Sequence, residues 1–373
     1  MEWNPIWSQV RVSAPILQMI SKKKKTIVFS IIALTDGEKI RIRFSGSLSK
    51  KAVVIGSLRI WVGGQSKPIT VNGETTFSIP AGQELLSDEI NLVVNRGDNI
   101  EVRIYYKSKT AESNAIEEEA ISFAGDKTRI ENLPYYQAPA YKDKYGVYEF
   151  IGGISKIELY SKQPAYRIIA FGDSITSMSR WTKPLQKRLQ DQYSGKYILL
   201  NAGISGNCLL YEKKGITGSL FGHKGIDRFS KDVLSEENLH AVILALGVND
   251  ITYFNSKTKN IINLENYRSS VTHLVKQLRS KGVRVIGQTL SPRKGYSFGK
   301  YTDEMETLRQ DINNWIRSCN LFDWLIDTDV LLRDPQNPTV VKDGLHQGDF
   351  LHPNQKGGQV IADAYDLQKL VGE

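Results

Sequence analysis

Residues 167–174 read Arg-Ile-Ile-Ala-Phe-Gly-Asp-Ser, an apolar strand-like run that ends in a glycine, an acid and a serine. Similar apolar runs follow downstream and alternate with amphipathic helical segments, a pattern typical of βαβ units around a parallel sheet. Strands are expected at 167–171, 197–200, 241–246, 283–288 and 324–327, and apolar helical stripes at 271–278, 305–316 and 360–367. We therefore predict an α/β domain with three α/β/α layers over residues 164–373.

The N-terminal part of the chain has a different period. Apolar and polar residues alternate over Ile40–Phe44, Leu58–Val62 and Ile100–Tyr105, and turn residues separate these runs. Short alternating strands without a convincing long amphipathic helix indicate an all-β sandwich or jelly roll. We predict that this accessory domain covers residues 1–163.

The composition is that of an ordinary globular protein. The 373 residues are 40% hydrophobic and 24% charged, with a formal net charge of +9. A single core usually stops growing at about 250–300 residues, which favours two domains. The densest basic run, Lys22–Lys25, is interpreted as a solvated turn, and no nucleic-acid-binding motif accompanies it. We expect no nucleic-acid partner, and the oligomeric state stays open.

The cysteine content and the N-terminal residues indicate the cellular compartment in which the protein is expected. Cys208 and Cys319 are far apart in sequence, which excludes a disulfide framework or a zinc site built on cysteine pairs, and both are expected to be buried thiols. Residues 1–5 lack the basic and apolar regions of a signal peptide, and the longest apolar stretch, 27–34, is too short to span a bilayer. These features predict a cytoplasmic protein without a membrane span.

Chemically useful residues follow the ends of several predicted strands. Gly-Asp-Ser-Ile-Thr follows the first at 172–176, Asn-Ala-Gly-Ile-Ser-Gly-Asn the second at 201–207, and Gly-Val-Asn-Asp the third at 247–250. Asp-Phe-Leu-His-Pro-Asn at 349–354 lies in the loop before the last helical stripe. In open parallel sheets, ligands bind outside the carboxyl ends of the strands. We therefore expect these four segments to meet at one edge.

Their residue types suit acyl transfer. A serine hydroxyl such as that of Ser174 becomes a strong nucleophile when a base removes its proton, and histidine titrates in the appropriate range. His352 is the predicted base, and Asp349, three residues earlier, can hold its second ring nitrogen. The backbone N–H groups of Ser174 and Gly206 and the side-chain amide of Asn249 would stabilise the oxyanion of a tetrahedral intermediate.

The four segments resemble the sequence blocks that define the SGNH (GDSL-type) hydrolase family: Gly-Asp-Ser, the glycine of the second block, Gly-x-Asn-Asp and Asp-x-x-His-Pro-Asn. The resemblance covers residues 166–373 and includes 228–234, 322–323 and 332–335. It implies a flavodoxin-like sheet and hydrolysis of small acyl esters without a metal or cofactor. The N-terminal half also looks like the jelly-roll domain that precedes the hydrolase domain in some of these esterases, including certain carbohydrate deacetylases.

Several of these residues have alternative readings. Asp343-Gly344-Leu345-His346 has the same Asp-x-x-His spacing as the later pair, which is preferred because Pro-Asn and Gly-Gly follow it. Ser174 could be a helix N-cap, Gly206 a turn glycine and Asn249 part of an Asx turn. Asp173 and Asp250 are predicted to have structural roles. The sequence does not determine whether His223 contacts substrate. The Gly-x-Ser-x-Gly elbow of other serine hydrolases is absent from the sequence.

The sequence thus predicts a serine esterase that forms an acyl-enzyme. Acetyl esters of carbohydrates are the leading substrate class, with a saccharide or another small acyl ester as the binding partner. Lysophospholipids, other acyl esters, or transfer of the acyl group to an acceptor are alternatives that use the same residues. A catalytically silent carbohydrate-binding protein is the alternative from another functional class.

Overall fold

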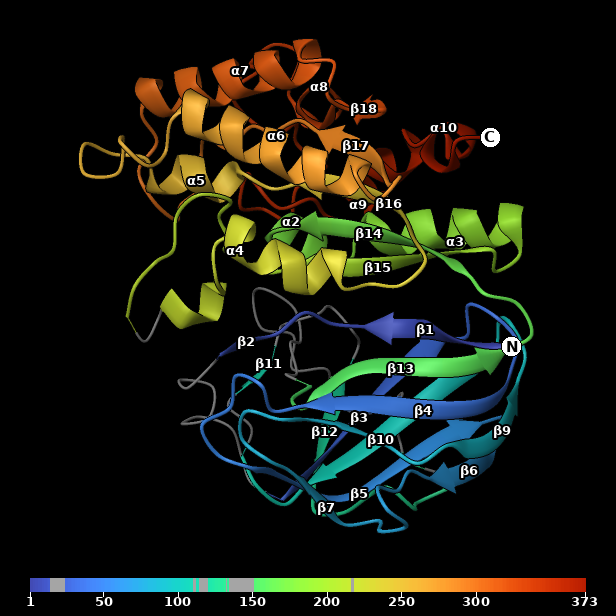
Figure 1. Ribbon diagram of the computed structural model, residues 1–373. Helices are drawn as coiled ribbons and strands as arrows, with labels where there is room; N and C mark the ends of the chain where they lie inside the picture. Colours follow the sequence, from blue (N-terminus) through green and yellow to red (C-terminus); the bar gives the residue numbers. More distant parts are fainter. Residues whose placement is uncertain (14–23, 110–111, 114–119, 132, 134–150, 216–217) are drawn as a thin grey trace. The chain divides into compact units, whose positions relative to one another are not determined.

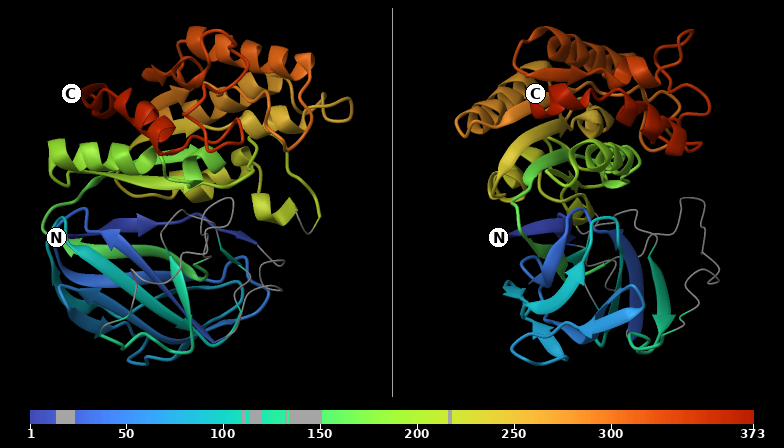
Figure 2. Two further views of the ribbon diagram at one scale, coloured as in Figure 1. Left: turned by 180° about the vertical axis from the view of Figure 1, so that it is seen from behind. Right: turned by 90° about the vertical axis from the view of Figure 1, so that its right-hand side faces the viewer.

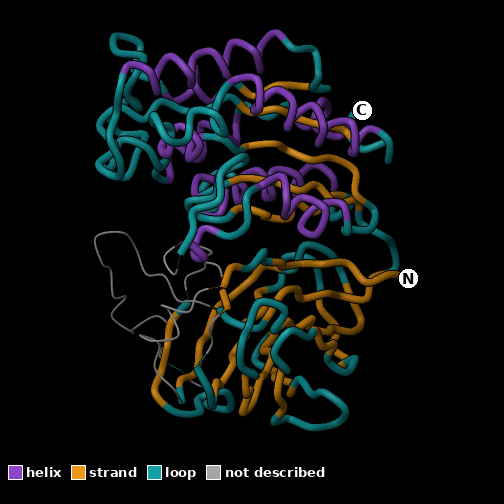
Figure 3. Tube along the Cα trace, turned by 60° about the vertical axis from the view of Figure 1, so that its left-hand side comes forward, coloured by secondary structure: helices purple, strands orange, loops and turns teal. Residues whose placement is uncertain are grey.

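The structure is a computed structural model that describes residues 1–13, 24–109, 112–113, 120–131, 133, 151–215 and 218–373. The chain divides into two compact units, one formed by 1–165 with 193–198 and the other by 166–192 with 199–373. The first unit consists almost entirely of strands and loops, and helices alternate with strands in the second (Figure 3). Within the described part of the chain, no helix has both the length and the hydrophobicity needed to cross a bilayer.

The N-terminal unit is a sandwich of two antiparallel sheets (Figure 1). One sheet has the strand order β1-β13-β4-β8, with β9 also paired to β4, and the other has the order β12-β3-β10-β5-β6, with β7 paired to β5. The first sheet comprises β1 (Glu2–Ser8), β13 (Ile154–Ser161), β4 (Gly37–Ser45), β8 (Glu84–Leu86) and β9 (Ile90–Val94). The second comprises β12 (Ile121–Ala124), β3 (Lys25–Ile32), β10 (Asn99–Tyr106), β5 (Val53–Val62), β6 (Gln65–Pro68) and β7 (Phe77–Ile79). A small pair is formed by β2 (Val12–Ser13) and β11 (Glu112–Ser113).

The alternating pattern of β4 accounts for its place in the sandwich. Ile40, Ile42 and Phe44 are completely buried in a core that both sheets share. Arg41, on the opposite face of the strand, donates from Nε to Glu158 on β13 at 2.7 Å. The all-β architecture predicted from the alternating runs is confirmed. The short strand β1 was not predicted, and Lys22 and Lys23 of the basic run lie outside the described residues.

The second unit is built on a five-stranded sheet of order β15-β14-β16-β17-β18. Its strands are β14 (Tyr166–Gly172), β15 (Tyr197–Gly203), β16 (Leu239–Ala245), β17 (Arg284–Gln288) and β18 (Trp324–Ile326). The pairs β14–β16, β16–β17 and β17–β18 are parallel. Numbered in chain order, this arrangement is the 2-1-3-4-5 order of flavodoxin-like sheets, whose ligands bind outside the carboxyl ends of the strands. The predicted α/β fold class is confirmed.

Helices cover both faces of this sheet (Figures 1 and 2). Contacts join α4 to α6 and α6 to α7 on one side. On the other side, α3 reaches α9 through a hydrogen bond from Arg188 to the carbonyl of Ala362. The helices are α2 (Ser174–Ser177), α3 (Thr182–Tyr193), α4 (Gly225–Phe229), α5 (Val248–Tyr253), α6 (Leu264–Arg279), α7 (Asp303–Ser318), α8 (Thr328–Leu332), α9 (Gln355–Asp363) and α10 (Leu367–Val371). A 3-10 turn (Gly218–Phe221) and a π-turn (Ser230–Leu234) complete the described helical segments.

The predicted apolar stripes are largely buried, with two departures. The stripe at 271–278 is buried along α6, as expected. Trp315, expected on the buried face of α7, is only half buried. The C-terminal stripe forms two helices because the side chain of Asp366 caps a new helix by accepting from the N–H of Lys369. Cys319, expected to be buried like Cys208, is half buried.

Candidate active site

Ser174 is the first residue of α2 and follows β14 directly. Asp173 is the N-cap of this short helix, and its Oδ1 accepts a hydrogen bond from the N–H of Ile175 at 3.0 Å. Burial raises the pKa of Asp173 to about 7. Through its hydrogen bond to the N–H of Ile175, the carboxyl group of Asp173 holds the turn that carries Ser174, in agreement with the structural role predicted for Asp173. Ser174 itself is only 6% exposed.

A chain of two hydrogen bonds links Ser174, His352 and Asp349. Ser174 Oγ lies 2.7 Å from His352 Nε2, although the two residues are 178 positions apart. His352 Nδ1 lies 2.6 Å from Asp349 Oδ2. A carboxylate at Nδ1 favours the tautomer with its proton on that nitrogen, so Nε2 can accept the serine proton. The structure thus brings together the three side chains that the sequence pattern selected.

The Asp349 carboxylate is held by four donors. Oδ1 accepts from the backbone N–H groups of Leu351 at 3.1 Å and His352 at 3.0 Å. Oδ2 accepts from Gln347 Nε2 at 3.1 Å in addition to the imidazole. Burial by itself would raise the pKa of Asp349, but the hydrogen bonds and the attraction of His352 hold it well below its usual range. The carboxylate is therefore ionised at neutral pH, as an orienting acid must be.

The loop that carries His352 is anchored on both sides. Asn354 caps α9 by accepting from the N–H of Gly357 at 2.9 Å, and its Nδ2 donates to the carbonyl of Gly344 at 2.9 Å. Arg180 donates from Nη1 to the carbonyl of Pro353 at 2.9 Å. Capping residues fix where a helix begins and how the chain enters it. The Pro-Asn of the last sequence block therefore positions the histidine next to it.

The three predicted oxyanion donors are the backbone N–H groups of Ser174 and Gly206 and the side-chain amide of Asn249. Among the described residues, the backbone N–H groups of Ser174 and Gly206 have no hydrogen-bond acceptor. Gly206 has φ of +75°, and a Cβ there would lie 2.2 Å from the ring of Phe221, so only glycine fits. Asn249 donates from Nδ2 to the carbonyl of Asn207 at 3.1 Å, which leaves its second amide hydrogen available.

Asp250 joins the Gly206 segment to the start of α5. Its two carboxylate oxygens accept from the backbone N–H groups of Leu209 at 2.7 Å and Leu210 at 2.8 Å. The side chain is completely buried, and burial raises the pKa of Asp250 to about 7. These contacts confirm the structural role predicted for Asp250. They also link the segment that follows Gly206 to the residue next to Asn249.

Arg228 is a positioning residue that sequence reasoning missed. Its guanidinium donates to the carbonyl of Gly172 at 2.9 Å and to that of Ala202 at 3.0 Å, near the ends of β14 and β15. It also donates to Asn207 Oδ1 at 2.9 Å and pairs with Asp232 at 3.0 Å. The residue thus connects the serine turn to the segment around Gly206. The family resemblance includes residues 228–234, but it gave Arg228 no role, and the i,i+4 Arg–Asp spacing usually marks a surface pair.

The rival pair is not at Ser174. His346 Nδ1 accepts from the backbone N–H groups of Gly348 at 3.0 Å and Phe350 at 3.1 Å, and Nε2 lies 3.5 Å from Asp343 Oδ1. The Asp343 side chain is 96% exposed. His346 therefore shapes the loop that leads to His352 rather than contacting Ser174.

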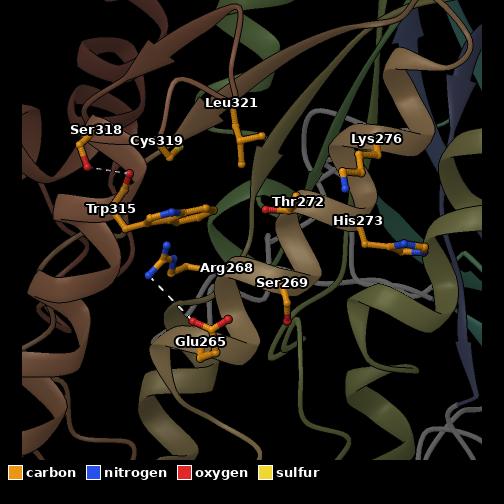
Figure 4. Close-up of a pocket in the computed structure, with 10 residues that line it drawn as sticks. All are labelled: Glu265, Arg268, Ser269, Thr272, His273, Lys276, Trp315, Ser318, Cys319 and Leu321. Atoms are coloured by element: carbon orange, nitrogen blue, oxygen red, sulfur yellow. Dashed lines mark hydrogen bonds and ion pairs between the residues drawn. The ribbon is translucent and has the colours of Figure 1, made fainter.

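The other histidines have separate surroundings. His223 is exposed, with Nδ1 3.2 Å from Glu212 Oε2. His240 Nε2 lies 2.9 Å from the carbonyl of Val371. His273 lies on α6 and lines a surface groove of about 670 Å³ between α6 and α7 (Figure 4). None of the residues predicted for the site belongs to that groove, which is lined by Glu265, Arg268, Ser269, Thr272, His273, Lys276, Trp315, Ser318, Cys319 and Leu321.

Comparisons with known proteins find one family and several similar solved structures. Residues 170–360, just over half of the chain, match the GDSL-like lipase/acylhydrolase family. Among curated proteins, no sequence relative matches the chain. Similar solved structures include the acetyl xylan esterase AlAXEase, with 23% identity over 53% of this chain and 96% of that one and a TM-score of 0.40.

Two further solved structures are similar. A catalytic mutant of an acetylxylan esterase from Geobacillus stearothermophilus has 18% identity over 57% of this chain and 97% of that one, with a TM-score of 0.41. A GDSL-like lipase from Bacteroides thetaiotaomicron has 16% identity over 56% and 90%, also with a TM-score of 0.41. The match over residues 170–360 shows that the chain belongs to the GDSL-like lipase/acylhydrolase family of carboxylic ester hydrolases.

Proposed function

We propose that the protein hydrolyses short acyl esters, acetyl esters of carbohydrates in particular, with Ser174 as nucleophile, His352 as general base and acid, and Asp349 as the orienting acid. The observation that carries this proposal is the hydrogen-bond chain from Ser174 Oγ through His352 to Asp349, at 2.7 and 2.6 Å. Both distances lie in the range that proton transfer between a nucleophile and its base requires.

The first half-reaction forms an acyl-enzyme. Ser174 Oγ attacks the ester carbonyl carbon while His352 Nε2 takes the hydroxyl proton, and Asp349 stabilises the resulting imidazolium. When the tetrahedral intermediate collapses, the C–O bond to the alcohol breaks and His352 returns the proton to the leaving oxygen. The products of this step are the free alcohol and Ser174 acylated on Oγ.

The oxyanion of the intermediate would accept hydrogen bonds from the N–H groups of Ser174 and Gly206 and from Asn249 Nδ2. These donors are held before the reaction by α2, by the Asp250 contacts to the Gly206 segment, and by the Asn249–Asn207 bond. Preorganised donors need no reorganisation as charge develops, and losing one typically costs about 2.7–4 kcal/mol of transition-state stabilisation.

The second half-reaction releases the acid. Water attacks the acyl carbonyl while His352 Nε2 accepts its proton, and the same three donors receive the second oxyanion. Collapse breaks the bond to Ser174 Oγ, which recovers its proton from His352. An alcohol or sugar in place of water would give acyl transfer by the same steps, so analysis of products with an acceptor present separates the two reactions.

Features around the nucleophile support a small acyl group on a sugar. Ser174 and His352 are only 6% and 8% exposed, so the reacting atoms lie below the surface. The ring of Tyr296 packs edge-on against His352, with centroids 5.7 Å apart. The rings of Tyr211 and Tyr253, which follow the Gly206 and Asn249 segments, lie 5.5 Å apart. Aromatic surfaces with a few convergent polar groups are typical of sites for small molecules.

The proposal is tested with Ser174→Ala and the matched variant Ser269→Ala, which alters an exposed serine on α6. Wild type and Ser269→Ala should hydrolyse 4-nitrophenyl acetate and react covalently with a fluorophosphonate probe. Ser174→Ala should lose both, with turnover reduced by about 10³-fold or more. Near-normal turnover by Ser174→Ala would refute the assignment, and an unlabelled wild type would favour a silent binding protein.

The substrate class needs a second comparison. Release of acetate from acetylated saccharides is measured beside release of fatty acid from lysophospholipids, at matched enzyme concentration. We expect acetate release to be faster. Faster release of fatty acid would replace the carbohydrate ester with a lysolipid while leaving Ser174 as the nucleophile.

A further inference from the structure

One buried arginine of the second unit lacks an acidic partner. The described chain has five buried arginines: Arg103, Arg167, Arg228, Arg293 and Arg309. Four of them form an ion pair, with Glu101, Glu236, Asp232 and Asp329, respectively. For Arg293, no acidic side chain of the described residues comes within ion-pair distance, although this side chain is only 1% exposed.

Two nitrogen atoms of Arg293 are unsatisfied. Nη1 lies 3.6 Å from the sulfur of Met305, a weak acceptor, whereas Nε and Nη2 have no hydrogen-bond partner among the described residues. Burial lowers the pKa of this guanidinium, since desolvation disfavours its charged form. A buried charge without a partner costs several kcal/mol, so its retention calls for a compensating contact.

The unsatisfied atoms form one edge of the guanidinium. Nε–H and one N–H of Nη2 point in parallel, and together they make the fork that binds both oxygens of a carboxylate. Two other arginines of the chain bind the carboxylate of an acidic side chain through the same two nitrogen atoms. Arg317 donates from Nε and Nη2 to Asp327 at 2.8 and 2.9 Å, and Arg309 donates from the same two atoms to Glu306. In Arg293 the equivalent edge is open.

Arg293 lies next to parts of the proposed catalytic site. The N–H of Tyr296 donates to the carbonyl of Arg293 at 3.1 Å, and the Tyr296 ring contacts His352. A Cβ on Gly299 would lie 3.7 Å from Arg293 Nη2 and 3.1 Å from Thr252 Cγ2. Thr252 is on α5, one helical turn after Asn249. The Arg293 side chain therefore lies near α5, the helix that carries Asn249, and the Arg293 backbone is bonded to the residue that packs on His352.

The segment around Arg293 is basic. Residues 291–302 contain Arg293, Lys294 and Lys300 and no Asp or Glu. Glu306, whose charge acts on Arg293, already accepts hydrogen bonds from Arg309 and Gln310. Lys294, Lys300 and most residues between them are exposed, so a positively charged surface lies beside the buried guanidinium of Arg293. An anionic group that approaches the site is attracted first by Lys294 and Lys300 and then by the unsatisfied Nε and Nη2 of Arg293.

We propose that Arg293 binds a carboxylate of the substrate, so that the ester cleaved at Ser174 is an acidic one. The proposal rests on the function proposed above and adds a specificity-determining residue to it. The carboxylate belongs either to the acyl group, as in a dicarboxylic half-ester, or to the alcohol, as in an acetylated uronic acid. Both present the same two oxygens to Nε and Nη2.

Two matched substrate pairs distinguish these sources. For the acyl side, mono-4-nitrophenyl succinate is compared with 4-nitrophenyl butyrate, and for the alcohol side, O-acetylated glucuronate with O-acetylated glucose. In wild type, kcat/KM should favour the acidic member of one pair. Arg293→Met should lower that acidic-to-neutral ratio by about 10- to 100-fold, the usual effect of losing hydrogen bonds to a charged group. Arg268→Gln, on the exposed surface of α6, should keep the wild-type ratio.

Thermal unfolding separates a binding role from a structural one. Because Arg293 has no acidic partner to lose among the described residues, Arg293→Met should keep or raise the Tm, whereas Arg309→Met should lower it by breaking a buried ion pair. Glucuronate or succinate should raise the Tm of wild type and not that of Arg293→Met. An unchanged ratio for both pairs, or a Tm loss in Arg293→Met as large as that in Arg309→Met, would overturn the proposal. Wild type that cleaves no ester at all would instead overturn the proposed function.

Discussion

Replacing Asp349 with asparagine should disable the histidine without moving it. In the wild type, Oδ1 faces two backbone donors, the N–H groups of Leu351 and His352, while Oδ2 faces His352 Nδ1 and the side-chain amide of Gln347. The Gln347 amide can turn its oxygen toward an NH₂ group, whereas the backbone donors cannot change. An asparagine has one oxygen and one NH₂ group to place at these positions. Two backbone N–H groups cannot both face an NH₂ group, so the oxygen takes the Oδ1 position and the NH₂ group faces Nδ1.

That orientation selects the wrong tautomer. Nδ1 must then accept from the amide, which places the imidazole proton on Nε2, against Ser174 Oγ. A protonated Nε2 cannot take the serine proton. Where an orienting aspartate of this kind is replaced in serine hydrolases, kcat falls by about 10⁴-fold. We therefore expect Asp349→Asn to lose about 10³- to 10⁴-fold in kcat, or about 4–5.5 kcal/mol of transition-state stabilisation.

The chain supplies a matched control in the rival pair. Asp343→Asn makes the same chemical change at the same spacing from a histidine, but its carboxylate is exposed and 3.5 Å from His346. Initial rates with 4-nitrophenyl acetate at neutral pH would give kcat for both variants, and Tm would show that both fold. The reasoning fails if Asp349→Asn retains more than about a tenth of the wild-type kcat, or if Asp343→Asn loses as much activity as Asp349→Asn.

Three further perturbations test other parts of the site. His352→Ala should abolish esterase turnover, whereas His346→Ala should reduce it only mildly. The opposite ranking in the same rate assay would show that His346, and not His352, is the base. Asn249→Ala should lower kcat by about 10²- to 10³-fold with little change in KM, because only the transition state carries an oxyanion; a rise in KM at constant kcat would argue against that role. Burial raises the pKa of Asp173 to about 7, against about 3.9 for an unfolded aspartate, so between these pH values the folded state keeps a proton that the unfolded state has released. The stabilisation from this retained proton is therefore complete below the unfolded pKa and decreases by about 1.4 kcal/mol per pH unit as the pH rises toward 7. The free energy of unfolding of Asp173→Asn, measured in urea, should therefore depend on pH with a slope smaller by about that amount. Equal slopes in the two proteins would contradict the raised pKa.

Much of the fold follows from patterns within single strands and helices. Period-two runs such as Ile40–Phe44 bury alternate side chains, and they form the predicted sandwich. Apolar runs such as Ile168–Phe171 are buried on both faces, and they form the predicted parallel sheet. The strand β1 escaped prediction because its alternation is weak and it contains Pro5, which usually marks an edge strand. The break between α9 and α10 depends on a cap at Asp366 rather than on periodicity.

The sequence by itself determined that Ser174, Gly206 and Asn249 follow the carboxyl ends of strands, because those positions are set by local periodicity and by the order of the segments. The sequence favoured the second of two Asp-x-x-His spacings through the residues that follow it, whereas only the tertiary structure shows its histidine in contact with Ser174, because that contact joins residues 178 positions apart. The same is true of Arg228 and Arg293. Whether a buried arginine has hydrogen-bond acceptors depends on residues distant in the chain, so no local pattern distinguishes the satisfied guanidinium from the open one.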